Sequence, residues 1–238
     1  MGKRPIIRQR GRSPKYKAHG FKFKAPSRHI PISTEVKKAK VIDLIHCPGH
    51  SAPLAKLEFE DGQIAHIVAP ENIHVGSSIQ YGDTISYDPG CTGPLESLPE
   101  GTLVHNIELS PGDGGKLVRS SGVSARIIMK TPEGVVIQLP SKKRKTIDPK
   151  CRASIGTVAG GGRLEKPMLK AGKRFHAHRA RSKLYPQVCG VSMNAVDHPF
   201  GGKSSHHKGK PTQTARRAPR GRKVGKIAPK RTGRKKGK

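Results

Sequence analysis

The sequence predicts a mostly β protein, with two small barrels in its middle and a long basic extension at each end. Short apolar segments with strand-like composition, separated by Gly and Pro turns, occupy the middle of the chain. No long segment repeats with the 3.6-residue period of an amphipathic helix, and the two ends are rich in Lys and Arg. The predicted parts are an arm at 1–35, barrels at 36–90 and 91–172, and a tail at 173–238.

The first barrel is predicted from four short strands. They are Val41–Ile45, Leu54–Glu60, Gln63–Ala69 and Ser78–Ser86. Asp61-Gly62 between two of them is the sequence signature of a tight type I′ hairpin. Four or five short strands without a long helix suggest a barrel of the oligonucleotide-binding (OB) type.

The second barrel follows Asp88–Pro94, a run of Pro and Gly where we place the domain boundary. Its predicted strands are Leu103–Leu109, Ala125–Lys130, Val135–Leu139 and Ile155–Val158, with a hairpin at Thr131–Gly134. This set fits a small barrel of the SH3-like type. The segment Lys166–Ala180 is expected to hold one short helix at most.

The charge of the chain points to a polyanionic partner. The net charge is +31, divided into +9 over residues 1–35, −4 over 36–140, +12 over 141–190 and +14 over 191–238. Such a field attracts phosphate backbones and releases their counterions on binding. The arm contains Pro5, Pro14, Pro26 and Pro31, so it is predicted to be extended and to follow a groove. The last 48 residues include only 10 hydrophobic ones and are expected to stay disordered until a polyanion neutralises them.

Composition also argues against several classes of protein. No stretch approaches the roughly 18 apolar residues of a membrane span, and MGKRPIIRQR lacks an apolar signal core, so a cytoplasmic protein without a membrane partner is expected. With no Trp and nine Phe and Tyr, base stacking should not dominate binding. The cysteines, Cys47, Cys91, Cys151 and Cys189, are scattered and are predicted to be small buried hydrophobes.

Two glycine-rich segments are candidates for phosphate contact. In Pro111–Gly122, exposed backbone N–H groups could form a nest for phosphate oxygens, closed by Lys116 and Arg119. The run Gly160-Gly161-Gly162-Arg163 permits close approach of another chain, with Arg163 as a phosphate clamp. The alternatives are an ordinary β-turn loop and a flexible linker, respectively.

A compact basic cluster, Lys142-Lys143-Arg144-Lys145, follows the predicted strand Val135–Leu139. Within a region of net charge +12 we interpret it as a patch that contacts the nucleic-acid backbone. A solvated face or an import signal is the alternative.

Metal binding and catalysis are both weakly supported. Cys47 and His50 stand three apart, but a zinc site needs four ligands, usually in paired spacing, and no metal or cofactor is expected beyond Mg²⁺ associated with RNA. Asp197-His198 resembles a base with its orienting carboxylate. No nucleophile motif such as GxSxG accompanies them, so no catalytic residue and no small-molecule substrate is predicted.

Four ordered blocks of the sequence form a recognisable set. They are Gly190–Gly202 (GVSMNAVDHPFGG), Leu98–Gly122, Val158–Gly172 and Arg220–Arg234. Together they resemble the L-two family of large-subunit ribosomal proteins: the first is similar to its signature loop, the second to its middle signature, the third to a further block, and the last to the tail of its archaeal and eukaryotic branch. There are departures at Phe200, where bacterial members have a second histidine, at Lys203 in place of a third glycine, and at Ala195 in place of a proline.

This resemblance implies an OB-like barrel followed by an SH3-like barrel, with basic ends threaded between rRNA helices of the cytoplasmic ribosome. It implies support of the rRNA fold around the peptidyl transferase centre and of subunit association, with neighbouring ribosomal proteins and the small subunit as further partners. Peptide-bond chemistry belongs to RNA in such particles, so His198 is implied to position rRNA. An archaeal source is favoured.

The residues expected to contact rRNA combine the basic clusters, the glycine runs and the signature loop. They are Lys116, Arg119, Lys142, Lys143, Arg144, Lys145, Gly160, Gly161, Gly162, Arg163, Lys173, Arg174, Arg179, Arg181, Asn194, Asp197, His198, Gly201, Gly202, Lys203, Arg216, Arg217, Arg220, Arg222 and Lys223. The competing hypotheses are a general basic binder of nucleic acid or chromatin, and an enzyme that uses Asp197 and His198.

Overall fold

The computed structural model describes residues 9, 11–31 and 35–231, and the chain divides into two units. The larger unit is Gly20–Met168, and the smaller one combines Met1–His19 with Leu169–Lys238. Each is described by itself below.

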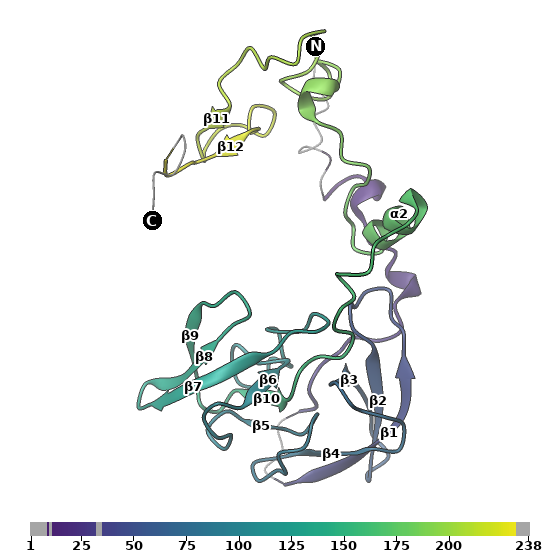
Figure 1. Ribbon diagram of the computed structural model, residues 1–238, viewed down its shortest axis with the longest axis vertical. Helices are drawn as coiled ribbons and strands as arrows, with labels where there is room; N and C mark the ends of the chain where they lie inside the picture. Colours follow the sequence, from purple (N-terminus) through teal and green to yellow (C-terminus); the bar gives the residue numbers. More distant parts are fainter. Residues whose placement is uncertain (1–8, 10, 32–34, 232–238) are drawn as a thin grey trace. The chain divides into compact units, whose positions relative to one another are not determined.

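The larger unit is built on one continuous ten-stranded sheet (Figure 1). Its strands are β1 (Lys37–Ile45), β2 (Leu54–Phe59), β3 (Ile64–Val68), β4 (Ser78–Tyr81), β5 (Thr92–Pro94), β6 (Leu103–His105), β7 (Ala125–Thr131), β8 (Gly134–Gln138), β9 (Arg144–Ile147) and β10 (Arg152–Ile155). A short 3₁₀ turn, η2 (Gly20–Lys22), precedes them. The mostly β prediction is confirmed.

The sheet order is β3-β2-β1-β4-β5-β10-β6-β7-β8-β9, and its pairing is open. A single parallel pair, Tyr81 with Thr92, joins β4 to β5, and β10 connects β5 to β6 by antiparallel pairing. The two predicted sets of strands are therefore continuous with each other, and their division into two closed barrels remains a prediction.

The β2–β3 hairpin is confirmed, but its predicted turn type is wrong. Of the two central residues only Gly62 has a positive φ, 75°, whereas a type I′ turn needs both. Gly62 N–H donates to the carbonyl of Phe59, and Phe59 N–H donates to Gln63. The loop is thus a three-residue connection with glycine at the left-handed position.

The β7–β8 hairpin is also confirmed. Thr131 pairs with Gly134, leaving Pro132 and Glu133 at the tip, and the Thr131 hydroxyl donates to the Gly134 carbonyl at 2.7 Å. β8 then pairs with β9, a strand that the sequence prediction did not include.

Several strand boundaries differ from the predictions. β1 starts at Lys37 instead of Val41, and β4 ends at Tyr81 instead of Ser86. The alternating segment Leu103–Leu109 is a strand only to His105, because Asn106 takes a left-handed conformation (φ 49°). The final strand starts and ends earlier than predicted, since Val158 leaves the sheet for an isolated bridge with Pro70. Within the Pro- and Gly-rich run assigned to the domain boundary, Thr92–Pro94 forms buried strand β5. Pairing with β10 outweighs the local turn signal there.

One hydrophobic core extends through both sets of strands. It includes Leu57 and Ile79 from the first set and Ile127 and Ile137 from the second, all fully buried. Cys47, Cys91 and Cys151 are buried as predicted, but Cys189 is exposed, contrary to the prediction.

The smaller unit has little regular structure. Its elements are η1 (Pro14–Tyr16), α2 (Ala171–Arg179), η3 (Gly190–Ser192), β11 (Gln213–Thr214) and β12 (Lys226–Ile227). The helix α2 lies within the segment where one short helix was expected. Of the residues described in this unit, only Val191 and Phe200 are buried. No described helix combines the length and apolarity that crossing a bilayer requires.

Candidate nucleic-acid interface

The two glycine-rich segments predicted separately lie against each other in the larger unit. Val158 accepts a hydrogen bond from Gly122 N–H, and the Arg163 guanidinium donates to the Ser121 hydroxyl at 2.8 Å. A Cβ atom on Gly122 would lie 2.6 Å from the Cα of Gly161, so the two backbones touch. The sequence predicted that another chain would approach Gly161 closely, and in this structure the segment that does so is Gly122 of the same chain.

The predicted phosphate nest is wrong at three of its amides. The N–H groups of Gly112 and Gly114 donate to the carboxylate of Glu108, and Gly115 N–H donates to Asp113. Glu108 is fully buried, and a buried carboxylate requires such donors. These three amides bind carboxylates of the chain itself and are not available for phosphate.

Lys116 and Arg119, the two cations expected to close that nest, have different surroundings. The ammonium of Lys116 lies 3.2 Å from Asp113, and the Lys116 side chain is 58% exposed, so it can still reach a ligand. The Arg119 guanidinium donates to the carbonyls of Gly115 and Ser27 at 3.2 and 2.8 Å. Arg119 thereby fastens a part of the predicted arm to the unit.

The docked segment, Ser27–Pro31, is the main feature that the sequence prediction missed. It belongs to the region expected to be a free arm, yet Ser27, His29 and Ile30 are buried. His29 Nε2 lies 2.6 Å from the Asn106 carbonyl, and its backbone N–H donates to Gly114. The proline and charge content of the arm concealed this short segment of apolar and neutral side chains.

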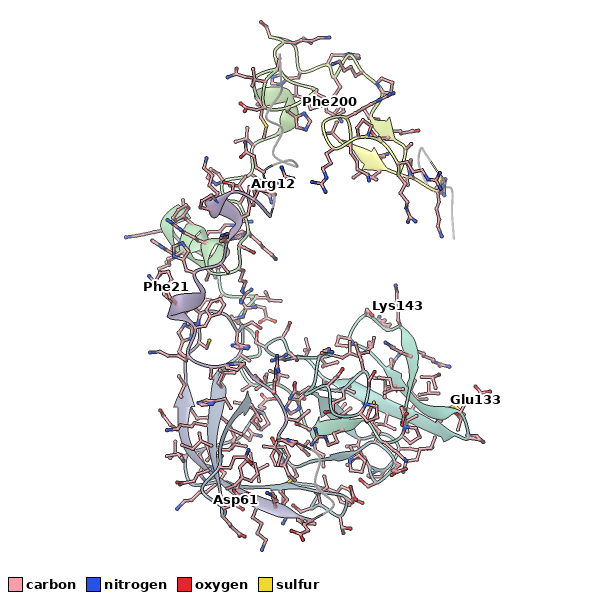
Figure 2. All side chains as sticks on the ribbon, turned by 180° about the vertical axis from the view of Figure 1, so that it is seen from behind. Arg12, Phe21, Asp61, Glu133, Lys143 and Phe200 are labelled. Atoms are coloured by element: carbon pink, nitrogen blue, oxygen red, sulfur yellow. The ribbon has the colours of Figure 1, made fainter. Side chains whose placement is uncertain are left out.

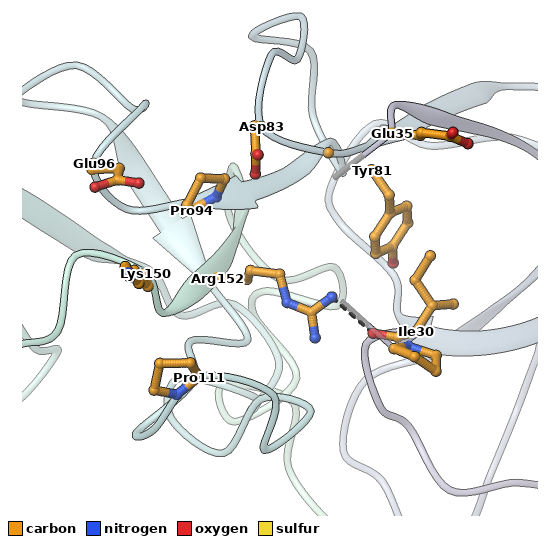
Figure 3. Close-up of a pocket in the computed structure, with 11 residues that line it drawn as sticks. Ile30, Glu35, Tyr81, Asp83, Pro94, Glu96, Pro111, Lys150 and Arg152 are labelled. Atoms are coloured by element: carbon orange, nitrogen blue, oxygen red, sulfur yellow. Dashed lines mark hydrogen bonds between the residues drawn. The ribbon is translucent and has the colours of Figure 1, made fainter. Parts of the chain in front are cut away.

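A buried ion pair holds the other end of the docked segment. Arg152 donates to both carboxylate oxygens of Glu108. It also donates, at 2.8 Å, to the carbonyl of Ile30 (Figure 3). Burial alone would raise the pKa of Glu108, but hydrogen bonds from the side chain and backbone of Arg152 lower it below its ordinary value. Tyr81 and Ile30 line the adjoining pocket of about 370 Å³. The sequence signal for this pair is a lone acid and a lone arginine, Glu108 and Arg152, each among mostly apolar or small neighbours.

The basic cluster forms a hairpin tip. Lys142 lies in the turn with φ 63°, and Arg144 and Lys145 begin β9. All four side chains are exposed, and Figure 2 shows Lys143 projecting from the loop that joins β8 to β9. The predicted cationic residues are thus brought together on one accessible projection.

In the smaller unit, the signature loop folds into a compact turn. Asp197 and His198 donate their backbone N–H groups to the Asn194 carbonyl, and Gly202 donates to Met193. The rings of His198 and Phe200 lie 5.2 Å apart between centroids, with Phe200 buried. The loop brings together the predicted residues Asn194, Asp197, His198, Gly201 and Gly202.

His198 lacks the arrangement of a catalytic base. Its Nδ1 accepts a hydrogen bond from Phe200 N–H at 3.1 Å, whereas an orienting carboxylate would need that nitrogen to donate. Burial lowers the pKa of His198 below its ordinary value and so favours the neutral imidazole. The ring is placed to pack and to hydrogen-bond.

The remaining predicted cations are spread over the smaller unit. Lys173, Arg174 and Arg179 lie on α2, whose described side chains include none that is buried, and Arg181 follows it. Arg216, Arg217, Arg220, Arg222 and Lys223 lie in the loop between β11 and β12, which pair in parallel, and Lys203 follows the signature loop. Among the residues described in this structure, no group of three His, Cys, Asp or Glu side chains is arranged to hold a metal ion.

Comparison with known proteins decides the family. The model described as "Ribosomal Proteins L2, RNA binding N-terminal domain" matches residues 7–81, and "Ribosomal Proteins L2, C-terminal domain" matches residues 88–221. The chain belongs to the ribosomal protein L2 family. The resemblance noted from the sequence blocks is therefore confirmed.

Relatives in the L2 family cover nearly the whole chain. The chain is 49% identical to large ribosomal subunit protein uL2 of Methanothermobacter thermautotrophicus, over 98% of this chain and 99% of the relative. It is 48% identical to the uL2 proteins of Halorubrum lacusprofundi and Methanococcoides burtonii, again over 98% of this chain. These relatives are archaeal, in agreement with the branch indicated by the tail motifs.

Proposed function

We propose that this L2-family chain is a structural, non-enzymatic component of the large ribosomal subunit in the cytoplasm, where it binds large-subunit rRNA. The observation that carries the proposal is the match of both L2 domains, including the one described as RNA binding, to a chain with unburied cationic surfaces. Residues 169–231 contain seventeen Lys and Arg against the single acid Asp197, and none of these seventeen side chains is buried. In the sequence of the smaller unit Asp197 is the only acidic residue, so most of that charge has no internal counter-charge.

The mechanism is electrostatic support of closely packed RNA strands. The sheet of the larger unit provides a rigid platform, and the exposed cations compensate phosphates that would otherwise repel one another. Selectivity comes from the shape of the RNA, its 2′-hydroxyls and its backbone geometry more than from base edges. The predicted boundaries, 36–90 and 91–172 for the two barrels, belong to this proposal.

The signature loop has a positioning role in this proposal. Its neutral His198 and buried Phe200 make a compact projection that packs against rRNA near the peptidyl transferase centre, and other surfaces support association with the small subunit. The loop carries no chemical step. Its compactness and the acceptor role of His198 Nδ1 support positioning over catalysis.

The test is the salt dependence of rRNA binding by the full chain. If six to ten phosphates are contacted, the affinity for a large-subunit rRNA transcript falls about 10³- to 10⁵-fold between 50 and 200 mM salt. Replacing Lys142, Lys143, Arg144 and Lys145 by Ala lowers the slope of log affinity against log salt by roughly 0.7 to 0.9 for each lost phosphate contact.

Lys37→Ala provides the matched control, because the ammonium of Lys37 is already paired with Asp61 at 2.7 Å. It should leave the slope nearly unchanged. An affinity independent of salt contradicts the proposal. Equal affinity for duplex DNA would instead favour a general basic binder.

A further inference from the structure

One pocket of the smaller unit combines aromatic rings with cations. It has a volume of about 440 Å³, within the range that accommodates small ligands, and its walls include Pro14, Lys15, Phe175, Arg179, Lys183 and Tyr185. The N-terminal turn η1 and helix α2 come together there, and Arg179 Nε donates to the His19 ring at 2.8 Å. Two chain segments far apart in sequence thus build one site.

The rings of this pocket are presented for stacking. Phe175 is 37% exposed, and the guanidinium of Arg179 lies 5.8 Å from its ring centroid. Arg174 lies 5.4 Å from the centroid of Tyr185 on the pocket wall. Aromatic faces and guanidinium planes are the two kinds of surface on which proteins stack unpaired bases.

The charge around the pocket suits a phosphodiester. No acidic residue occurs between Lys166 and Val196, while Lys15, Arg179 and Lys183 line the pocket. A neutral peptide segment would leave these cations without counter-charges. An acidic peptide segment would pair with them but would not need the exposed ring. An RNA nucleotide satisfies both features, with its base on the ring and its phosphate on the cations.

The helix that carries Phe175 is only weakly supported by the part of the chain that the structure describes. The N-cap residue of α2, Lys170, makes no side-chain capping bond, and no residue of the helix is buried. A nine-residue helix is marginal in water without packing on one face. A partner against the Phe175 face would supply that packing.

We propose that this pocket captures a single unpaired rRNA nucleotide, whose base stacks on Phe175 while Lys15 and Lys183 hold the adjoining phosphates. The inference rests on the proposed rRNA-binding function and adds to it a base-stacking site, a mode that the low aromatic content argued against as a dominant one. The selectivity of the site is for an unstacked base and not for a particular base identity.

The test compares two RNA hairpins that differ only by one bulged adenosine. The full-length chain should bind the bulged hairpin more tightly. Phe175→Leu should weaken binding to it by about 5- to 150-fold, the usual effect of losing one stacked base, and should leave the paired hairpin unaffected. The slope of log affinity against log salt should not change, because no charge is removed.

Three variants control this experiment. Tyr185→Phe keeps the ring and should retain the preference for the bulge, and Tyr87→Leu removes a 63% exposed ring that lies outside the pocket. Lys183→Ala should lower the salt slope by about 0.7 to 0.9 while the bulge preference persists. An unchanged preference in Phe175→Leu overturns the inference but leaves salt-dependent binding, and with it the proposed function, intact. Absence of salt-dependent RNA binding by the wild type counts against both the inference and the proposed function.

Discussion

At the scale of single residues, Gly122 shows how tightly the two glycine loops are joined. Its φ is 70°, and an added Cβ would lie 2.6 Å from the backbone of Gly161. Gly62 has nearly the same φ, 75°, but an added Cβ there would meet nothing within 4 Å. The two positions therefore separate the effect of backbone conformation from that of steric contact.

Gly122→Ala should destabilise the larger unit more than Gly62→Ala does. The conformational cost of alanine at positive φ is about 1 kcal/mol at both sites, and the clash at Gly122 adds about 1 to 3 kcal/mol. Thermal or denaturant unfolding of the two variants measures the difference. Equal destabilisation would show that the loops can separate at no cost.

Sequence reasoning located these glycines but not their partner. The runs at 111–122 and 160–163 were both expected to approach another molecule closely. Their contact with each other depends on the bridge between Val158 and Pro70 and on hydrogen bonds such as that from Gly122 to Val158. Contacts between residues so distant in sequence leave no local pattern.

At the scale of elements, the docked segment Ser27–Pro31 couples the fold to proton binding. Burial lowers the pKa of His29, and separately that of His105, to about 4. Around His29 stand Arg152, Glu108 and His105, with Asn106 accepting its hydrogen bond. Both rings are therefore neutral in the folded protein at pH 7.

The free energy of unfolding of the larger unit should decrease as the pH is lowered from about 6.5 to about 4. In this window the unfolded chain binds protons at these histidines and the folded one does not, so the full contribution is present above the unfolded pKa. Each histidine contributes up to about 1.4 kcal/mol per pH unit. Denaturant unfolding at several pH values measures the slope.

His29→Gln isolates the contribution of the docked segment, because glutamine can donate to the Asn106 carbonyl but does not titrate. Between these pH values, the change in the free energy of unfolding per pH unit should be smaller than in the wild type by the contribution of one proton, up to about 1.4 kcal/mol. The same slope in both proteins would mean that His29 is solvated, and that the segment does not stay docked.

Elements were predicted unevenly for physical reasons. The hairpins around Asp61-Gly62 and Pro132-Glu133 were found because turn residues and flanking apolar segments are local signals. Strand β5 was missed because Thr92–Pro94 has turn composition and is held by pairing with β10. The docked segment was missed because the prediction of a free arm rested on the net charge and proline content of 35 residues. Those averages do not reveal that three side chains within the arm are buried.

At the scale of the whole molecule, the two units differ in what stabilises them. The larger unit contains a core of fully buried aliphatic side chains that reaches from β1 to β10. The described part of the smaller unit buries Val191 and Phe200 alone. Hydrophobic burial can therefore account for folding of the first unit but not of the second.

Removal of residues 191–238 should leave the cooperative unfolding of the larger unit, Gly20–Met168, unchanged, because the deleted residues belong to the other unit. The melting temperature should stay within about 2 °C of that of the full chain in the absence of RNA. Calorimetry of both proteins measures this. Loss of the cooperative transition would place the tail inside the folded core.

The position of β9 in the sheet has a consequence for the freshly synthesised protein. Among the described strands β9 lies at one edge of the sheet, next to β8, and it carries Arg144 and Lys145. Before incorporation into a particle, two copies could join edge to edge and aggregate, but facing rows of like charge oppose that encounter. The cations that we propose contact RNA thus also oppose aggregation of the protein before it has bound RNA.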